Sequence, residues 1–145
     1  MSRAALAVLP LVGLAGWLIV AGTGTAPADS AQIFEGRALY AETCAACHGA
    51  DLEGQPDWRR PGPDGRLPAP PHDASGHTWH HPDDMLLRIT RLGTAAVVGN
   101  GYESNMPGFA DRLGDAQIEA VLAYIKSTWP EELREHQAEI SAPPD

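Results

Sequence analysis

Cysteine and lysine are scarce in this chain of 145 residues. Only two cysteines are present, Cys44 and Cys47, so no second cysteine pair completes the usual set of four zinc ligands. Lys126 is the only lysine, and the formal net charge is −9 without any basic stripe. Because proteins that bind nucleic acid neutralise its phosphates with Lys and Arg, this composition argues against a nucleic-acid partner. The negative charge favours a protein partner with a basic docking patch, or it only keeps the protein soluble.

The chain also lacks the alternating apolar pattern of β-strands, and it contains no internal repeat. Apolar residues recur instead at helical spacing, and the length favours one small domain. We therefore expect an all-α fold, with helices over residues 33–46, 82–92, 115–127 and 131–140. Asp115 is the candidate N-cap of the third helix, and the fourth is polar and is expected to pack loosely. A long loop rich in Pro and Gly, residues 49–81, connects the first helix to the second.

The N-terminal segment carries a signal for export. Residues 4–22 are apolar and uncharged, and Ala26-Pro27-Ala28 follows with the small-x-small pattern of signal-peptidase cleavage. Residues 1–28 are therefore a signal peptide, or else a membrane anchor, since residues 4–22 come close to the roughly 20 residues that span a bilayer. Both interpretations place the remainder in the periplasm, either soluble or anchored by residues 4–22.

The two cysteines belong to one short motif, Cys44-Ala45-Ala46-Cys47-His48. The pattern C-x-x-C-H is the attachment site of a c-type haem, in which two thiols form thioethers and the adjacent histidine coordinates the iron. A thioredoxin-like redox disulfide is the main alternative, but no alternating strands and helices surround the motif. The motif thus predicts one covalent haem c bound through Cys44 and Cys47, with His48 as an iron ligand.

A second motif, Asn105-Met106-Pro107-Gly108-Phe109, precedes the helix over residues 115–127. Together with the first motif it resembles class I cytochrome c, of the monohaem, exported bacterial type. The resemblance covers residues 34–129 and implies N- and C-terminal helices that cross around one covalently bound haem. It also implies that Met106 is the second axial ligand, and thioether sulfur favours reduced iron.

The resemblance assigns further residues to the fold. In the family the two helices cross at a glycine and aromatic residues, which Gly36 and Tyr40 match on the first helix and residues 122–125 on the last. Short members of the family place Gly-Pro-x-Leu soon after the proximal histidine, and the proline carbonyl accepts a hydrogen bond from its ring. This chain has Ala69-Pro70-Pro71-His72 at a greater distance, so we assign that role to Pro70 or Pro71.

Four histidines follow within ten positions, at 72, 77, 80 and 81. They lack Cys or carboxylate partners at recognisable ligand spacing, so a structural role or a bond to a haem propionate is preferred over a copper or zinc site. Trp79 is a further candidate neighbour of the haem. Arg59 and Arg60, beside Trp58, are candidates for a propionate or a solvated basic pair.

These features predict a single-electron carrier, not an enzyme, that serves redox proteins such as membrane respiratory complexes or periplasmic oxidoreductases. Its cytochrome c domain would span residues 29–130 and be followed by a helical, acidic tail at 131–145. Two alternatives stay open: a subunit of a periplasmic dehydrogenase or oxidase complex, and a haem sensor or enzyme with an open sixth position.

Overall fold

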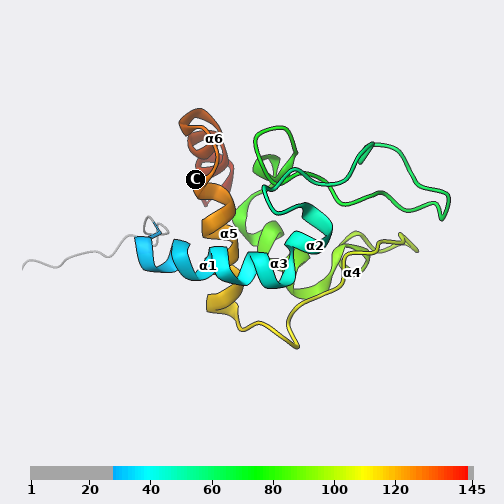
Figure 1. Cartoon of the computed structure of the whole chain (residues 1–145), viewed down its shortest axis with the longest axis horizontal. Coiled ribbons are helices and arrows are strands. Elements are labelled where there is room, and N and C mark those ends of the chain that lie inside the picture. Colours follow the sequence, from blue (N-terminus) through cyan, green and yellow to red (C-terminus); the bar gives the residue numbers. More distant parts are fainter. Residues whose placement is uncertain (1–27, 144–145) are drawn as a thin grey trace, which may run out of the picture.

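The computed structural model describes residues 28–143, which form helices and loops without a β-strand (Figure 1). The elements are α1 (Ser30–Thr43), α2 (Ala45–His48), the 3₁₀ helix η1 (Thr78–His80), α3 (Asp83–Leu92), α4 (Thr94–Val98), α5 (Asp115–Ser127) and α6 (Glu131–Ser141). The predicted all-α fold is confirmed. No helix within residues 28–143 is long and apolar enough to cross a membrane. The predicted export segment lies outside the described residues, apart from its last residue.

The first predicted helix is divided in two. α1 begins at Ser30 because the Asp29 side chain caps it, accepting a hydrogen bond from the Gln32 backbone N–H at 2.7 Å. It ends at Thr43 because Cys44 departs from helical geometry, with φ −115° and ψ −37°, before the single turn of α2 begins. This break sets the two cysteines and His48 on a separate turn beside the long loop.

α5 spans the predicted residues 115–127, but its predicted cap is wrong. Gly114 is the N-cap, and Asp115 is already the first helical residue. The Gln117 side chain accepts a hydrogen bond from the Gly114 backbone N–H at 3.0 Å. Asp115 instead places its negative charge in the first turn, where the helix dipole favours it.

α1 crosses α5, as Figure 1 shows, and the two backbones approach closely at Gly36. A Cβ placed on Gly36 would overlap the carbonyl group of Ala120, and a backbone carbonyl cannot swing aside as a side chain can. Tyr40, one turn further along α1, packs on Tyr124 with ring centroids 5.5 Å apart. The predicted crossing at a glycine and aromatic residues is thus present in the structure.

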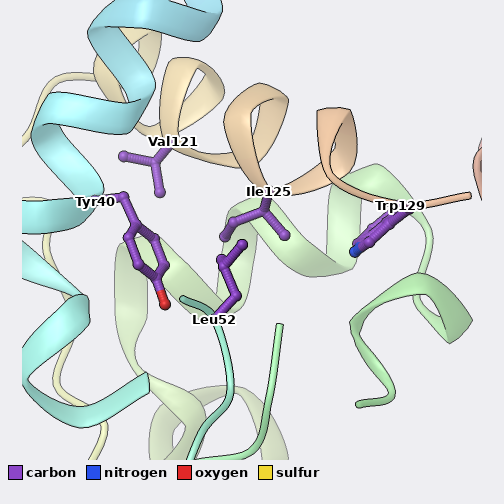
Figure 2. Packing of buried hydrophobic residues seen from close by; sticks show 5 residues of the cluster. All are labelled: Tyr40, Leu52, Val121, Ile125 and Trp129. Carbon is purple, nitrogen blue, oxygen red and sulfur yellow. The ribbon is translucent and has the colours of Figure 1, made fainter. Parts of the chain in front are cut away.

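One part of the core joins this helix pair to the long loop. Tyr40 from α1, Val121 and Ile125 from α5, and Leu52 from the loop point toward one another, and Trp129 lies at the end of the cluster (Figure 2). All five are at most 4% exposed. Burial of each such side chain contributes roughly 1.5–3 kcal/mol, so the loop is held by the same core as the helices.

α6 is packed closely, against the prediction of a loosely attached tail. Gln137 is fully buried, and its Nε2 donates to Asp83 Oδ1 at 2.6 Å and to the His81 carbonyl at 3.2 Å. Lys126 on α5 pairs with Asp83 at 2.7 Å. Polar side chains of α6 thus make its contacts with Asp83 and His81, while Leu133 of the same helix packs against the core cluster.

Candidate functional site

A cavity of about 610 Å³ lies between the end of α1, the long loop, α3 and α5. Its volume falls within the range of small-molecule and cofactor sites. Cys44, Cys47, His48 and Met106, the residues that the sequence predicts around a haem, all line it. The apolar part of the wall includes Leu86, Ile89, Val121, Leu122 and Ile125. Tertiary packing therefore brings both sequence motifs to one apolar cavity.

His48 is buried and has a defined tautomer. Its Nδ1 lies 2.8 Å from the carbonyl oxygen of Pro70, and since a carbonyl only accepts, Nδ1 carries the proton. The lone pair of Nε2 is therefore available for a metal. Burial lowers the pKa of His48, although the bond to Pro70 acts in the opposite direction. Of the two candidate prolines, Pro70 makes this contact, whereas Pro71 is buried against Gly54 and Gly76.

Pro70 follows His48 by 22 residues, and the loop returns to it through a closed neck. The Gln55 N–H donates to the Ala69 carbonyl at 2.8 Å, and the Ala69 N–H donates to the Gln55 side chain at 2.9 Å. Gly54 adopts φ +68° and lies so close to the Pro70–Pro71 backbone that a Cβ would overlap it. These contacts at the base of the loop hold Pro70 in position, and residues 56–68 extend beyond them.

Met106 lies in the loop between α4 and α5, which packs against the end of α3. Gly93 and Pro107 form an isolated antiparallel bridge, and a Cβ on Gly108 would lie 2.6 Å from the Arg91 carbonyl oxygen. Backbone therefore contacts backbone at the two residues that follow the methionine. These contacts restrict the loop and place the Met106 thioether at the cavity.

Two hydroxyl groups orient Met106 further. Thr94, the first residue of α4, donates a hydrogen bond to Met106 Sδ at 3.4 Å. The Ser104 side chain accepts a hydrogen bond from the Met106 backbone N–H at 3.1 Å. Sequence reasoning missed both contacts, because α4 is a five-residue helix without a recognisable pattern.

The tip of the long loop is joined to the methionine loop. Arg66 donates to the Asn105 side chain at 2.9 Å, and it lies 3.7 Å from Glu103. Asn105 also donates to Asp64 at 3.5 Å. These exposed contacts are individually weak, but they connect the loop that supplies Pro70 to the loop that supplies Met106.

The histidines at 72, 77, 80 and 81 separate into different surroundings. His72 stacks on His48, His77 stacks on Trp58, and His80 stacks on Trp79. His81 meets the edge of His77. Within residues 28–143, no group of three or more His, Cys, Asp or Glu side chains could hold a metal ion. The histidine segment therefore contributes packing and cavity wall.

Three of these histidines line the cavity, namely 72, 77 and 81, and in all three burial is the main cause that lowers the pKa. The buried Nδ1 of His77 has no hydrogen-bond partner among the described residues. An unpaired buried polar atom is costly, and this one lies in the cavity wall, where a polar group of a bound molecule could pair with it.

The other expected neighbours of a haem differ in their positions. Trp79 is not one of the residues that line the cavity. It packs against the core cluster and stacks on His80. Trp58 lines the cavity, and the Arg59 guanidinium lies 4.0 Å from its ring centroid. Arg60 is exposed. Trp58 is thus in the cavity wall, whereas the placement of Trp79 beside a haem stays a prediction.

Comparison with known proteins decides the family. The family model for cytochrome c matches residues 33–129, which include both motifs and both crossing helices. The chain belongs to the cytochrome c family. Membership implies covalent haem c and supports electron transfer as the function of this cytochrome c.

Two curated relatives carry the name Cbb3-type cytochrome c oxidase subunit CcoP. The cytochrome is 34% identical to the Azospirillum protein over 68% of its own length and 29% of the relative. It is 30% identical to the Rhodobacter capsulatus protein over 70% of its own length and 31% of the relative. The chain thus spans less than a third of these relatives. No solved structure gave a significant match.

The described residues fit a c-type haem. The thiols of Cys44 and Cys47 lie free at the cavity, Nε2 of His48 has an available lone pair, and the thioether of Met106 is within the same wall. His77 adds a buried nitrogen that lacks a partner among residues 28–143. Soft sulfur and imidazole are the donor set that this family of iron sites uses.

Proposed function

We propose that this cytochrome c carries single electrons through one haem, attached at Cys44 and Cys47 and ligated by His48 and Met106. The observation that supports the proposal most is that an oriented imidazole and a thioether, far apart in sequence, line the same apolar cavity. The haem supplies the one-electron Fe(III)/Fe(II) couple, and the protein sets its ligation and surroundings.

The roles of the side chains follow from their contacts. Pro70 holds the Nδ1 proton of His48, which fixes the tautomer and makes the ring a stronger donor. Thr94 has the opposite effect on the other ligand. Its hydroxyl donates a hydrogen bond to the Met106 sulfur and so makes the thioether a weaker electron donor to iron. The apolar residues of α3 and α5 exclude water and so favour the reduced, less charged state. His77 is the proposed polar partner of a haem carboxylate.

A ligation experiment tests the proposal. The purified protein should show a c-type optical spectrum, the weak near-infrared band of iron–methionine ligation, and no rapid binding of carbon monoxide at neutral pH. Met106→Leu should remove the band and allow carbon monoxide to bind. Met85→Leu, which changes a methionine of α3, is the matched control and should leave both properties unchanged. Rapid, stoichiometric carbon monoxide binding by the unaltered protein would instead identify a sensor or enzyme with an open sixth position.

A second candidate function is that of a subunit of a terminal oxidase complex. The two relatives that bear an oxidase subunit name support it, as does the apolar segment at residues 4–22. In this case residues 1–28 remain attached and hold the domain on the periplasmic side of the membrane. The test is a haem stain of membranes solubilised in mild detergent and separated under native conditions. Migration at the size of the free 15.4 kDa chain would reject the subunit proposal.

Location and cleavage are tested together. We propose that the domain is exported and that residues 1–28 are either removed or retained as an anchor. Intact-mass measurement of the haem-stained protein separates a chain that begins at Asp29 from one that retains residues 1–28. A haem-stained band in the soluble cytoplasmic fraction alone would contradict export.

A further inference from the structure

His72 lies face to face with the imidazole of His48. The ring centroids are 4.0 Å apart, and the ring planes differ by 21°. His72 occupies the position two residues after the acceptor Pro70, where the Gly-Pro-x-Leu segment of the family has leucine. A planar aromatic ring therefore replaces a flexible aliphatic side chain beside the iron-binding histidine.

Hydrogen bonds hold both the backbone and the ring of His72. Its backbone N–H donates to the Leu52 carbonyl at 2.8 Å, and its own carbonyl accepts from Trp129 Nε1 at 2.7 Å. Its Nδ1 lies 2.8 Å from the hydroxyl of Thr78, which is buried in η1. Leu52 and Trp129 both belong to the core in Figure 2. These contacts fix the position of the His72 ring, against which the His48 ring stacks.

The hydrogen bond to Pro70 does not by itself determine the plane of the His48 ring. An N–H···O hydrogen bond tolerates roughly 30° of bending at its hydrogen, so the bond to Pro70 limits the tilt of the imidazole but leaves the ring some freedom to turn about its Cβ–Cγ bond. A contact on the face of the ring removes that freedom. In this chain the stacked ring of His72 provides such a contact.

We propose that His72, anchored by Thr78, is a positioning residue that sets the plane of the proximal imidazole relative to the haem. This inference rests on the proposed ligation by His48. The plane of an axial imidazole determines the direction in which its π orbital overlaps the iron orbitals, and hence how the unpaired electron of the ferric state spreads over the four pyrrole rings. His72 therefore determines which part of the haem carries the spin density.

Proton NMR of the ferric holoprotein reads this property directly, since the four haem methyl resonances report the spin density on their pyrroles. We expect His72→Leu, which removes the planar ring, to change the order or the spread of these resonances. His72→Phe keeps a ring that can stack but loses the bond to Thr78, so its pattern should stay closer to the native one than that of His72→Leu. Thr78→Val removes the anchor but keeps the ring, so its shifts should fall between those of the native protein and His72→Leu.

His80→Leu is the matched control, because His80 is an exposed histidine of the same segment that stacks on Trp79 away from His48. The proposal is overturned if His72→Leu leaves the methyl pattern as close to the native one as His80→Leu does, even where it lowers the melting temperature. It is equally overturned if His72→Phe scrambles the pattern as much as His72→Leu. If His72→Leu does not mature, the comparison of Thr78→Val with His80→Leu decides the question in the same way.

The native spectrum separates failure of this inference from failure of the proposed function. Loss of the iron–methionine band and of low-spin ferric resonances in the unaltered protein would reject the ligation itself. A normal native spectrum with no effect of His72→Leu would reject only the role of His72.

Discussion

The carbonyl oxygen of Pro70 accepts a hydrogen bond from His48 Nδ1 at 2.8 Å across 22 residues of intervening loop. The contact depends on the loop neck, where Gly54 packs directly against the backbone of Pro70 and Pro71. In the ligation proposed above, this bond would make His48 a better electron donor, stabilise ferric iron and lower the reduction potential.

Gly54→Ala should therefore raise the reduction potential, because the added Cβ displaces the Pro70 carbonyl from His48. A hydrogen bond contributes about 1 kcal/mol and 1.4 kcal/mol corresponds to about 59 mV for one electron, so the rise should not exceed roughly 40 mV. Gly65→Ala is the control, since Gly65 has a similar φ of +78° but open space around it. Redox titration of both variants measures the difference, and equal potentials would contradict the role of the neck.

Thr94→Val should lower the reduction potential by a comparable few tens of mV at most. The valine lacks the hydroxyl that donates to Met106 Sδ, so the sulfur becomes a stronger donor and ferric iron is stabilised. Thr94→Ser retains the hydroxyl and should stay close to the native potential. A lower potential in both variants would assign the effect to packing of α4 instead of the hydrogen bond.

Gly36→Ala should destabilise the holoprotein by about 3 kcal/mol, because the new methyl group overlaps the Ala120 carbonyl and forces the two helices apart. Thermal unfolding followed at the haem absorbance measures the loss. Gly114→Ala introduces the same methyl group where its nearest neighbour is 3.9 Å away, and it should cost only about 1 kcal/mol, from the poorer N-cap. Equal stability of the two variants would show that α1 and α5 can separate without cost.

Gln137→Ala should lower the free energy of unfolding by about 2 kcal/mol. The substitution removes the buried amide that donates to Asp83 and to the His81 carbonyl, leaving Asp83 with Lys126 as its partner, and it loosens α6 from η1. Urea unfolding gives the difference, with Glu139→Ala on the exposed face of the same helix as the control. A native midpoint for Gln137→Ala would restore the prediction of a loosely packed tail.

Local sequence was sufficient for much of the fold. The interval from Asp115 to Ser127 was predicted at its full length because its apolar residues recur every three to four positions. The break at Cys44 and the short helix α4 were not predicted, since neither has a periodic pattern long enough to recognise. The buried position of Gln137 was missed for a related reason, because a polar residue on a polar helix carries no sign that its partners lie on α3 and the loop.

The sequence alone determined the cofactor chemistry, because the spacing of Cys44, Cys47 and His48 is a covalent property of five consecutive residues. The sequence also limited the hydrogen-bond acceptor of the proximal histidine to two prolines, and the resemblance to class I cytochrome c marked Met106 as the second ligand. Only the tertiary structure decided that Pro70 meets His48, that Thr94 meets the methionine sulfur, and that His72 lies against the proximal ring. Those contacts join residues that are distant along the chain, and their geometry depends on how the loop is closed and how the core is packed.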